Sequence, residues 1–528
     1  MKNKLTKRFI HNAKQSNVCI CIAMKPFAQA VALITVFTVA TRAVGFLFRI
    51  FLSRVLGAEM LGVYQIAMSF FMVFLTVIAS GLPLAISKEV AKARERGGEH
   101  NKEIGAIAIA GLVISLIVST ALCGIVFVFR EFVDTIFTDR RCLNILLILL
   151  PSIIACSVYT ALRAVWWGEK KFFLLGATEL FEQVVRVLFF VILLGFGFAG
   201  LDSAGLAGLS FTIACVASAA AVIYIYLKGR KGTIAGTREQ SRRFYRPLIR
   251  SALPITGVRV IGSIALPIIS VIIPLRLVAS GWTNIQAISQ YGIVVGMTLP
   301  LLTIPGTIIS ALATALVPEL SGAHERHDHK NVSAQISNAL KFTLFVTFII
   351  LPTFMALGEQ IGLFLYDNTL SGTYLASTAW VMIPLSLNQI TNAILNSLGA
   401  EIKALKHYFY GSIALFAIVW FFPSLIGVNA LIVGMGICML ITSCLNLLMI
   451  AKLTNAKTQV LRLTLAFIGI SIPATLLGQY MFGIIQHIWP LIISLPLAGA
   501  ATVAVVLLFC KMFNLVDLGI ILRKNRKL

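Results

Sequence analysis

TRAVGFLFRIFLSRVLG, residues 41–57, carries three arginines inside an apolar run that begins near Phe27. A cation near the centre of a bilayer costs about 2.5–3.5 kcal/mol on insertion scales, so it needs water or an anionic partner. Arg42 and Arg49 share one face of a helix, about 10 Å apart along its axis. Arg54 lies near the end of the run, where its long side chain can also reach the membrane surface. The stretch predicts a membrane helix that lines a wet, cationic cavity.

The composition places the whole chain in a membrane. Hydrophobic residues make up 59% of the 528 residues, charged residues only 12%, and the mean hydropathy is +0.94. Soluble domains of this size do not have such a composition, so we expect an all-α protein with many membrane spans. The net charge of +24 would suggest nucleic-acid binding in a soluble protein. Here the basic residues gather in alternate loops, as the positive-inside rule predicts, and no nucleic-acid partner is expected.

The apolar runs predict about fourteen transmembrane helices. Six are expected in the first half, near residues 27–51, 63–86, 104–129, 142–166, 172–197 and 205–227. Eight more are expected near residues 251–277, 287–317, 342–362, 377–399, 408–427, 429–451, 463–485 and 489–511. An even number of crossings, with basic residues before the first and after the last, predicts that both termini are cytoplasmic.

Two matching landmarks indicate that the halves are copies of one another. The second span of each half ends in a proline with a serine shortly after it, at Pro83 and at Pro318. The fourth span of each half ends in a glycine followed by Glu and Lys, at Gly168 and at Gly399. The two pairs have nearly the same offset, which favours a single duplication. Six helices per copy give both copies the same orientation, so the repeat is parallel.

The repeat predicts two six-helix lobes, with the substrate site between them. The expected segments are a cytoplasmic tail (1–26), an N-lobe (27–227), a basic cytoplasmic linker (228–250), a C-lobe (251–451), two further helices (452–512) and a basic cytoplasmic tail (513–528). The last two helices fall outside the repeat.

The fifth span carries three charged side chains on one narrow stripe. Glu179, Glu182 and Arg186 follow one another at intervals that keep them on one side of a helix, and the last two are four residues apart. Such a stripe either forms an internal ion pair that fixes packing or faces the same cavity as Arg42. We expect the cavity, where a carboxylate can take up a proton or hold a mobile arginine.

Two further polar groups are candidates for the cavity. Arg259 and Arg276 bracket the seventh span about 25 Å apart, so they either reach opposite membrane surfaces or face the cavity. On the tenth span Asn388, Asn392 and Asn396 form a polar line that either packs helices or contacts substrate.

Motifs of enzymes are missing from the sequence. It has no phosphate-binding loop of nucleotide hydrolases, no Gly-x-Ser-x-Gly and no HExxH. We therefore expect no enzyme activity, no metal and no cofactor. The energy for transport would come from the membrane potential or from a Na⁺ or H⁺ gradient.

Four stretches, in this order, resemble one transporter superfamily: TRAVGFLFRI (41–50), SGLPLAISKEVA (80–91), YGIVVGMTLPLL (291–302) and LYDN (365–368). They look like the multidrug/oligosaccharidyl-lipid/polysaccharide (MOP) exporters, and within these the polysaccharide transporters of the stage V sporulation protein B type. The resemblance implies two six-helix lobes. It also implies a central cationic cavity like that of the related MurJ-type lipid II flippases, whose first cavity arginine Arg42 matches.

The resemblance and the arginines together predict a flippase in the bacterial cytoplasmic membrane. It would move an undecaprenyl-pyrophosphate-linked cell-wall precursor, peptidoglycan or another polysaccharide, from the inner to the outer leaflet, with a role in spore cortex synthesis. Arginine suits this substrate because it binds phosphate bidentately. The expected partners are this lipid-linked saccharide and membrane lipid, and the chain is expected to be a monomer. Two alternatives stay open, namely a drug or cation antiporter of the same superfamily and a membrane-embedded transferase.

Overall fold

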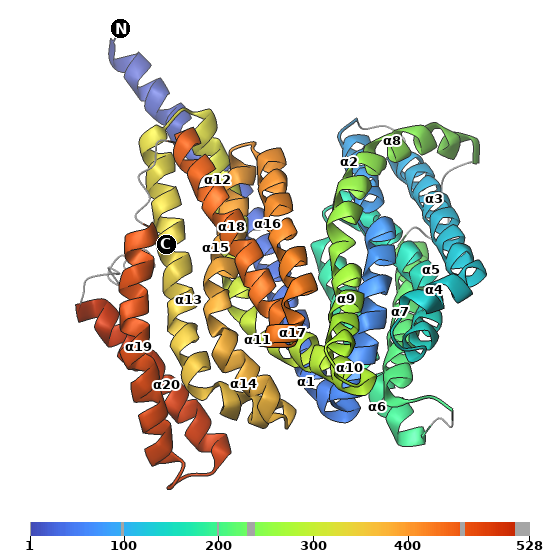
Figure 1. The fold of residues 1–528 in the computed structure, drawn as a ribbon. Helices are drawn as coiled ribbons and strands as arrows, with labels where there is room; N and C mark the ends of the chain where they lie inside the picture. The colour runs from blue at the N-terminus through green and yellow to red at the C-terminus, as the bar shows by residue number, and fades with distance from the viewer. Residues whose placement is uncertain (1, 97–99, 198–199, 230–237, 455–459, 513–528) are drawn as a thin grey trace. The chain divides into compact units, whose positions relative to one another are not determined.

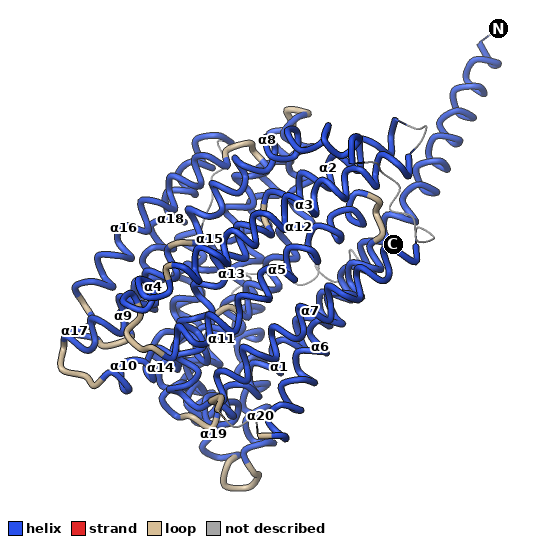
Figure 2. The backbone as a smooth tube through the Cα atoms, turned by 90° about the vertical axis from the view of Figure 1, so that its right-hand side faces the viewer, coloured by secondary structure: helices blue, strands red, loops and turns tan. Residues whose placement is uncertain are grey.

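The computed structural model describes residues 2–96, 100–197, 200–229, 238–454 and 460–512 (Figure 1). For residues 2–35 the backbone alone is described. Every regular element in these ranges is helical, as the tube in Figure 2 shows. Part of the predicted linker (230–237) and the predicted tail 513–528 lie outside the described residues.

The chain divides into two compact units. The first unit comprises Met1–Leu52 and Ile66–Ile268, and the second comprises Ser53–Gln65 and Ile269–Leu528. The division between Ile268 and Ile269 falls inside one helix, so the seventh span contributes to both units. The short segment 53–65 of the first helix belongs to the second unit. The expected lobe ranges 27–227 and 251–451 stay a prediction.

The helices of the first unit are α1 (Lys2–Ala79), α2 (Gly81–Arg96), α3 (His100–Val128), α4 (Arg130–Ile136), α5 (Arg141–Gly168), α6 (Phe172–Phe196), α7 (Ser203–Gly229) and α8 (Arg238–Ser263). The division between the units runs through α9 (Ala265–Ala279). The second unit continues with α10 (Asn284–Gly292), the π-helical turn η1 (Ile293–Thr298), α11 (Leu299–Leu302), α12 (Ile304–Glu325), α13 (His329–Tyr366), α14 (Thr369–Thr378) and the 3₁₀ turn η2 (Ala379–Val381). It ends with α15 (Met382–Ser397), α16 (Glu401–Phe421), α17 (Pro423–Ile426), α18 (Asn429–Thr454), α19 (Val460–Ile485) and α20 (Leu491–Met512).

Twelve described helices are long and apolar enough to cross a membrane. One of them, Val36–Arg96, covers the predicted first and second spans, and two, Asn284–Leu302 and Ile304–Glu325, cover the predicted eighth. The predicted fifth and tenth spans correspond to α6, which carries three charges, and to α15, which is only 16 residues long. The prediction of an all-α protein with about fourteen spans is therefore confirmed, and the chain is a multi-pass membrane protein.

α1 and α6 pack side by side in the first unit. The ring of Phe37 lies 5.6 Å from that of Phe173, and the ring of Phe48 lies 5.6 Å from that of Phe190. Between these contacts Gly45 faces Gln183. The residue numbers increase together along both helices, so α1 and α6 run in the same direction. This is expected, because α1 and α6 correspond to the predicted first and fifth spans, and odd-numbered spans cross the membrane in the same direction.

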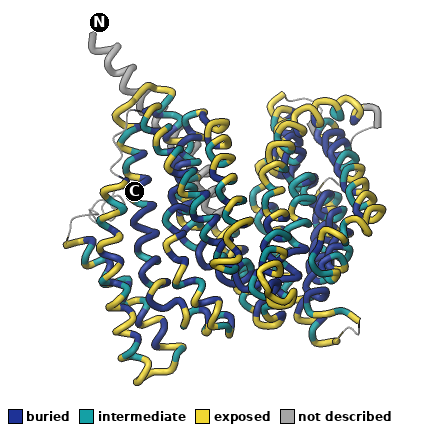
Figure 3. The backbone as a smooth tube through the Cα atoms, viewed as in Figure 1, coloured by how far each residue is buried: buried dark blue, intermediate teal, exposed yellow. Residues whose placement is uncertain are grey.

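The core of the second unit forms around α13. Buried side chains along its length, including Ile336, Leu344 and Phe348, pack against α12, α15, α19 and α20. The ring of Phe348 stacks on that of Phe467 at 5.1 Å. Figure 3 shows the buried length of α13, which α19 and α20 cover. The two helices outside the predicted repeat thus complete an apolar core.

Candidate functional site

A charged cluster joins α5 and α6 in the first unit. Arg163 donates from Nη2 to a carboxylate oxygen of Glu179 at 3.1 Å and to the main-chain oxygen of Leu175 at 2.8 Å. Its guanidinium also lies over the ring of Tyr159, 4.8 Å from the centroid. The cation is therefore held by an anion, a carbonyl group and an aromatic face at once.

Glu182 and Arg186 form the second ion pair of this cluster. Arg186 donates from Nη2 to Oε1 of Glu182 at 2.7 Å, and both side chains are only 16% exposed. The Arg186 guanidinium lies 4.3 Å from the ring centroid of Phe211 on α7. The four-residue spacing on one helix brings the two groups together, as the sequence predicts.

Several buried polar atoms of the cluster have no partner. In the described part of the chain these atoms are the Tyr159 hydroxyl, Nε of Arg163, Oε1 of Gln183 and Nε of Arg186. A buried polar group that lacks a hydrogen bond costs about 1–3 kcal/mol. Such groups are uncommon in folded proteins unless a polar ligand or water hydrogen-bonds to them. The cluster therefore has donor and acceptor atoms available for a polar ligand or for water.

Two exposed arginines of the first unit have no hydrogen-bond or ion-pair partner among the described residues. Arg42 on α1 and Arg259 on α8 are exposed, and neither makes a hydrogen bond or ion pair with any described residue. Because Gly45 lies beside Gln183 and the helices run in parallel, Arg42 lies at about the height of Glu179. Arg49 is also exposed, two turns further along the face that carries Arg42.

The other two predicted cavity arginines contact the ends of helices in the second unit. Arg54 donates from Nε to the main-chain oxygen of Leu365 at 2.8 Å and from Nη2 to that of Phe364, both in the last turn of α13. Arg276 donates from Nε to the main-chain oxygen of Trp420 at 2.8 Å, at the end of α16, and lies 5.2 Å from the Trp420 ring centroid. Both cations thus satisfy carbonyl groups that a helix end leaves unpaired.

The asparagine line of α15 is divided between the interior and the surface. The side chain of Asn392 donates to Oδ1 of Asn388 at 3.1 Å, and both residues are partly buried. Asn396, one turn further on, is exposed. The structure therefore brings two of the three amides together.

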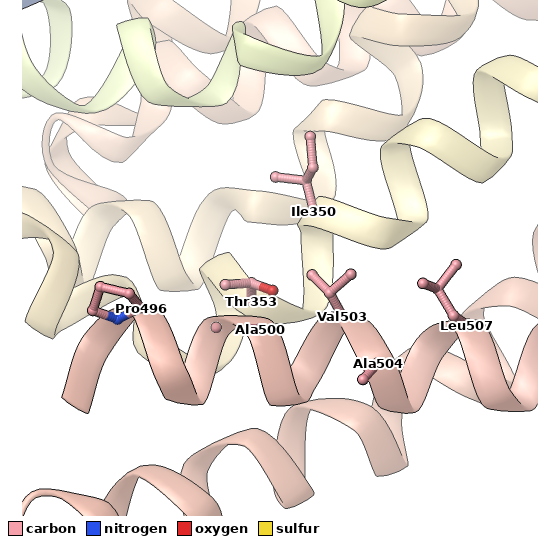
Figure 4. Close-up of a pocket in the computed structure, with 8 residues that line it drawn as sticks. Ile350, Thr353, Pro496, Ala500, Val503, Ala504 and Leu507 are labelled. Carbon is pink, nitrogen blue, oxygen red and sulfur yellow. The ribbon is translucent and has the colours of Figure 1, made fainter. Parts of the chain in front are cut away.

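An apolar groove runs along α13 and α20 in the second unit (Figure 4). Its volume is about 410 Å³. Val503 and Leu507 extend from α20 toward Thr353 and Ile350 of α13, and the small side chain of Ala500 leaves room between the helices. The groove fits a flexible hydrocarbon chain better than a polar group, because its lining is almost entirely aliphatic.

Arg163 was missed as a site residue by reasoning from the sequence. Its partner Glu179 lies 16 residues away, across the turn between α5 and α6, so no helical spacing links them. The signal was an arginine within an apolar span, the same signal that identified Arg42.

The chain is similar to proteins of known family. The sequence profile of the family described as "Polysaccharide biosynthesis protein" matches residues 27–324, more than half of the chain. Stage V sporulation protein B of Bacillus subtilis (strain 168) is 24% identical over 514 residues, which cover 94% of this chain and 97% of that protein.

Two solved transporter structures share the fold. The lipid II flippase MurJ, in an inward closed conformation, aligns with a TM-score of 0.67 at 17% identity, over 91% of this chain and 98% of that one. An inward-facing multidrug resistance transporter of the MATE family, in the MOP superfamily, aligns with a TM-score of 0.65 at 14% identity, over 80% of this chain and 96% of that one. At these identities the likeness shows the fold alone, which is that of MOP-superfamily transporters.

Proposed function

The chain belongs to the polysaccharide biosynthesis protein family, and from this membership we propose that it is a flippase for a lipid-linked saccharide. The substrate class is an undecaprenyl-pyrophosphate-linked cell-wall precursor, which moves from the inner to the outer leaflet of the cytoplasmic membrane by alternating access. The lipid II flippase MurJ has the same fold, and stage V sporulation protein B is a relative over nearly the whole chain. Both likenesses support a peptidoglycan precursor used in spore formation.

The observation that carries the proposal is the unpaired guanidinium of Arg42 on a membrane-spanning helix. A cation at this position is costly unless an anion visits it, and no described residue supplies one. A diphosphate headgroup supplies two such anions, and the planar fork of arginine matches phosphate oxygens in pairs. Arg259 extends the cationic surface of the first unit in the same way, and the exposed Arg49 also contributes to it.

The apolar groove on α13 and α20 supports the lipid part of the proposal. A polyprenyl chain must stay in apolar surroundings while its headgroup crosses, since each buried CH₂ contributes about 0.8 kcal/mol. The groove offers an aliphatic surface for part of that chain.

A drug or cation antiporter is the second candidate, favoured by the shared fold of a multidrug transporter. Such a protein needs a free carboxylate to attract a cation. The carboxylates of Glu179 and Glu182 are each paired with an arginine. The cluster is therefore less suited to bind a cationic ligand than an anionic one. The flippase is therefore the better supported proposal.

A flipping assay with the purified chain in vesicles tests the proposal. Fluorescent lipid II and undecaprenyl-linked lipids with other glycans would be placed in both leaflets, and loss of fluorescence to an external quencher would report their exchange. We expect exchange of at least one lipid-linked saccharide above that of empty vesicles. Exchange of none of them, together with efflux of a cationic dye, would favour the antiporter instead.

A further inference from the structure

The first turns of α8 form a basic segment of the first unit. Residues 238–250 contain five arginines against one glutamate, a net charge of +4. Four of these arginines are exposed, and none of the four makes a hydrogen bond or an ion pair with any described residue: Arg242, Arg243, Arg246 and Arg250. These cations are therefore available to an anion from outside the chain.

The carboxylates on the neighbouring helices do not neutralise this segment. α8 packs against α2 and α3. Glu89 on α2 is paired with Lys92 at 2.8 Å, and Glu103 on α3 lies 3.5 Å from Arg96. Glu95 is exposed and forms no ion pair with any described residue. Because α2 itself carries four basic residues against two carboxylates, the surface beside the arginines of α8 is basic as well.

Three of the exposed arginines share one side of α8 with aliphatic side chains. Arg242, Arg246 and Arg250 follow one another at intervals of four residues, which keeps them on one side of a helix. Ile249 and Leu253 lie on the same side and are 47% and 68% exposed. We call the surface made by these five residues the basic face. It presents cations and apolar groups together, as a surface that binds lipid does.

The opposite side of the same turns is fixed in the core of the first unit. Leu248 is fully buried and Ala252 nearly so, and Phe244 and Tyr245 pack against the same core. The helices approach closely here, since a Cβ atom at Gly81 of α2 would overlap the carbonyl group of Ala252. The basic face is therefore held in place before any ligand arrives, which lowers the entropic cost of binding.

The length of the span places the basic face at the membrane surface. The membrane-spanning segment that contains α8 runs from Gln240 to Ala279, which is 40 residues. About 20 helical residues cross the hydrocarbon core, so the first turns of α8 extend beyond it, to the depth of the lipid headgroups. Figure 1 shows them at the same end of the unit as the last turn of α2 and the first turn of α3. The pattern of basic residues predicts that this end is cytoplasmic.

We propose that the basic face binds an anionic phospholipid of the cytoplasmic leaflet, with the phosphate at the arginines and an acyl chain along Ile249 and Leu253. Arginine binds phosphate oxygens in pairs. Leu253 lies seven residues after Arg246, about 10 Å along the helix, so the polar and apolar contacts can belong to one lipid molecule. An exposed face at the edge of a span meets bulk lipid at all times, which favours a phospholipid as the ligand.

This site is separate from the cationic surface of the proposed flippase mechanism. Arg259 lies nine residues after Arg250, about 14 Å further along α8 and on the opposite side of the helix. Binding of the phospholipid therefore does not depend on the proposed function, and it can be measured without any transport.

A fluorophore attached to Gly257→Cys, in a background without native cysteines, reports on the site. Gly257 lies one turn beyond Leu253 on the same side of α8, and a Cβ atom there meets nothing within 4 Å. The full chain would be placed in phosphatidylcholine vesicles with a small fraction of lipid that carries a spin label on its acyl chain. This lipid is either phosphatidylglycerol or phosphatidylcholine. Because the two quenchers differ in headgroup charge, the ratio of their quenching measures the preference for an anionic lipid.

We expect the chain with its native arginines to prefer phosphatidylglycerol. One arginine near an anionic lipid surface strengthens binding about fivefold, so the preference should lie between about fivefold and a hundredfold. The preference should disappear in a variant that combines Arg242→Gln, Arg246→Gln and Arg250→Gln. The control removes the same charge from exposed positions of the second unit and should keep the preference; it combines Lys403→Gln, Lys406→Gln and Arg462→Gln.

Three outcomes would overturn the proposal. They are equal quenching by both lipids in the chain with its native arginines, a preference that survives the loss of the three arginines, and an equal loss of preference in the control. If the triple variant does not fold, Arg246→Gln alone decides, with an expected loss of about fivefold. An unchanged preference in this single variant would contradict the basic face as the binding site.

Discussion

The guanidinium groups of this protein differ in what they contact. Arg54 and Arg276 bind main-chain oxygens at helix ends, and Arg163 and Arg186 bind carboxylates and aromatic faces. Arg42 has none of these contacts with described residues. Substitutions of the arginines that bind main-chain oxygens at helix ends should therefore affect folding. A substitution of Arg42 should affect transport.

Arg42→Ala should reduce flipping while leaving the amount of folded protein near that of the wild type. A charge-assisted hydrogen bond contributes about 1.5–3 kcal/mol, so the loss should be about tenfold to a hundredfold. Arg42→Lys keeps the charge but loses the planar fork, and an intermediate loss is expected. The measurement is lipid exchange in vesicles, normalised to folded protein.

Arg54→Ala is the matched control for Arg42→Ala, because it removes an arginine twelve residues further along the same helix. It should lower the melting temperature by freeing the last carbonyl groups of α13 and leave exchange per folded protein unchanged. Normal exchange by well-folded Arg42→Ala would remove the cationic surface from the mechanism.

The Glu182–Arg186 pair should show strong coupling in a double-mutant cycle. Removing one partner of a buried pair leaves an uncompensated charge and typically costs about 3–5 kcal/mol. Glu182→Gln and Arg186→Met should each destabilise the protein, and the double variant should recover much of the loss. Thermal unfolding of the purified variants measures this. Strictly additive effects would show that the 2.7 Å contact contributes no interaction energy.

A single helix, α1, shows how a break in the backbone directs packing. Its regular dihedral angles stop at Gly57, which has φ of 69° and ψ of 178°, a conformation that glycine adopts without a steric penalty. Beyond this point Gly62 packs directly on α10, where a Cβ atom would overlap the carbonyl group of Ile288. Gly292 on α10 in turn meets the carbonyl group of Ala58.

Gly62→Ala should therefore destabilise the protein by about 1–3 kcal/mol, the usual cost of overpacking. Gly469→Ala in α19 is the control, since a Cβ atom there meets nothing within 4 Å. That change should be neutral or raise stability by up to about 1 kcal/mol, because alanine favours helix more than glycine does. Melting temperatures of the two variants should move apart, and equal shifts would contradict the close approach of α1 and α10.

Over the whole molecule, the sequence predicts the features that depend on neighbouring residues. Apolar runs predict the spans, and a four-residue spacing predicts the contact of Glu182 with Arg186. The partners of Arg54 are 310 and 311 residues away, and His407 meets Asn446 across 39 residues. No periodic pattern relates such positions, because their contact depends on how separate helices pack. The helix-end role of Arg54 and the contact of His407 with Asn446 therefore required coordinates.

The alternating topology predicts which loops a reagent outside the cell can reach. In a background without native cysteines, Arg243→Cys should escape a membrane-impermeant maleimide in intact cells, because it lies in the predicted cytoplasmic linker. His487→Cys, in the loop between α19 and α20, should react. Both side chains are exposed, so a difference in their labelling would reflect the side of the membrane on which they lie and not burial within the fold. Labelling at Arg243→Cys would invert the predicted orientation.

The assignment of residues 53–65 to the second unit has a consequence for biosynthesis. These residues leave the ribosome more than two hundred positions before Ile269, where the rest of that unit begins. Leu61 and Val63 are fully buried in the finished protein, so the nascent chain must keep them in lipid or against an insertion factor until α10 arrives. A gene cut between the two units would give a carboxyl-terminal fragment without this piece of its core. Co-expression of fragments divided at residue 268 should therefore restore folding only when the first fragment keeps residues 53–65 intact.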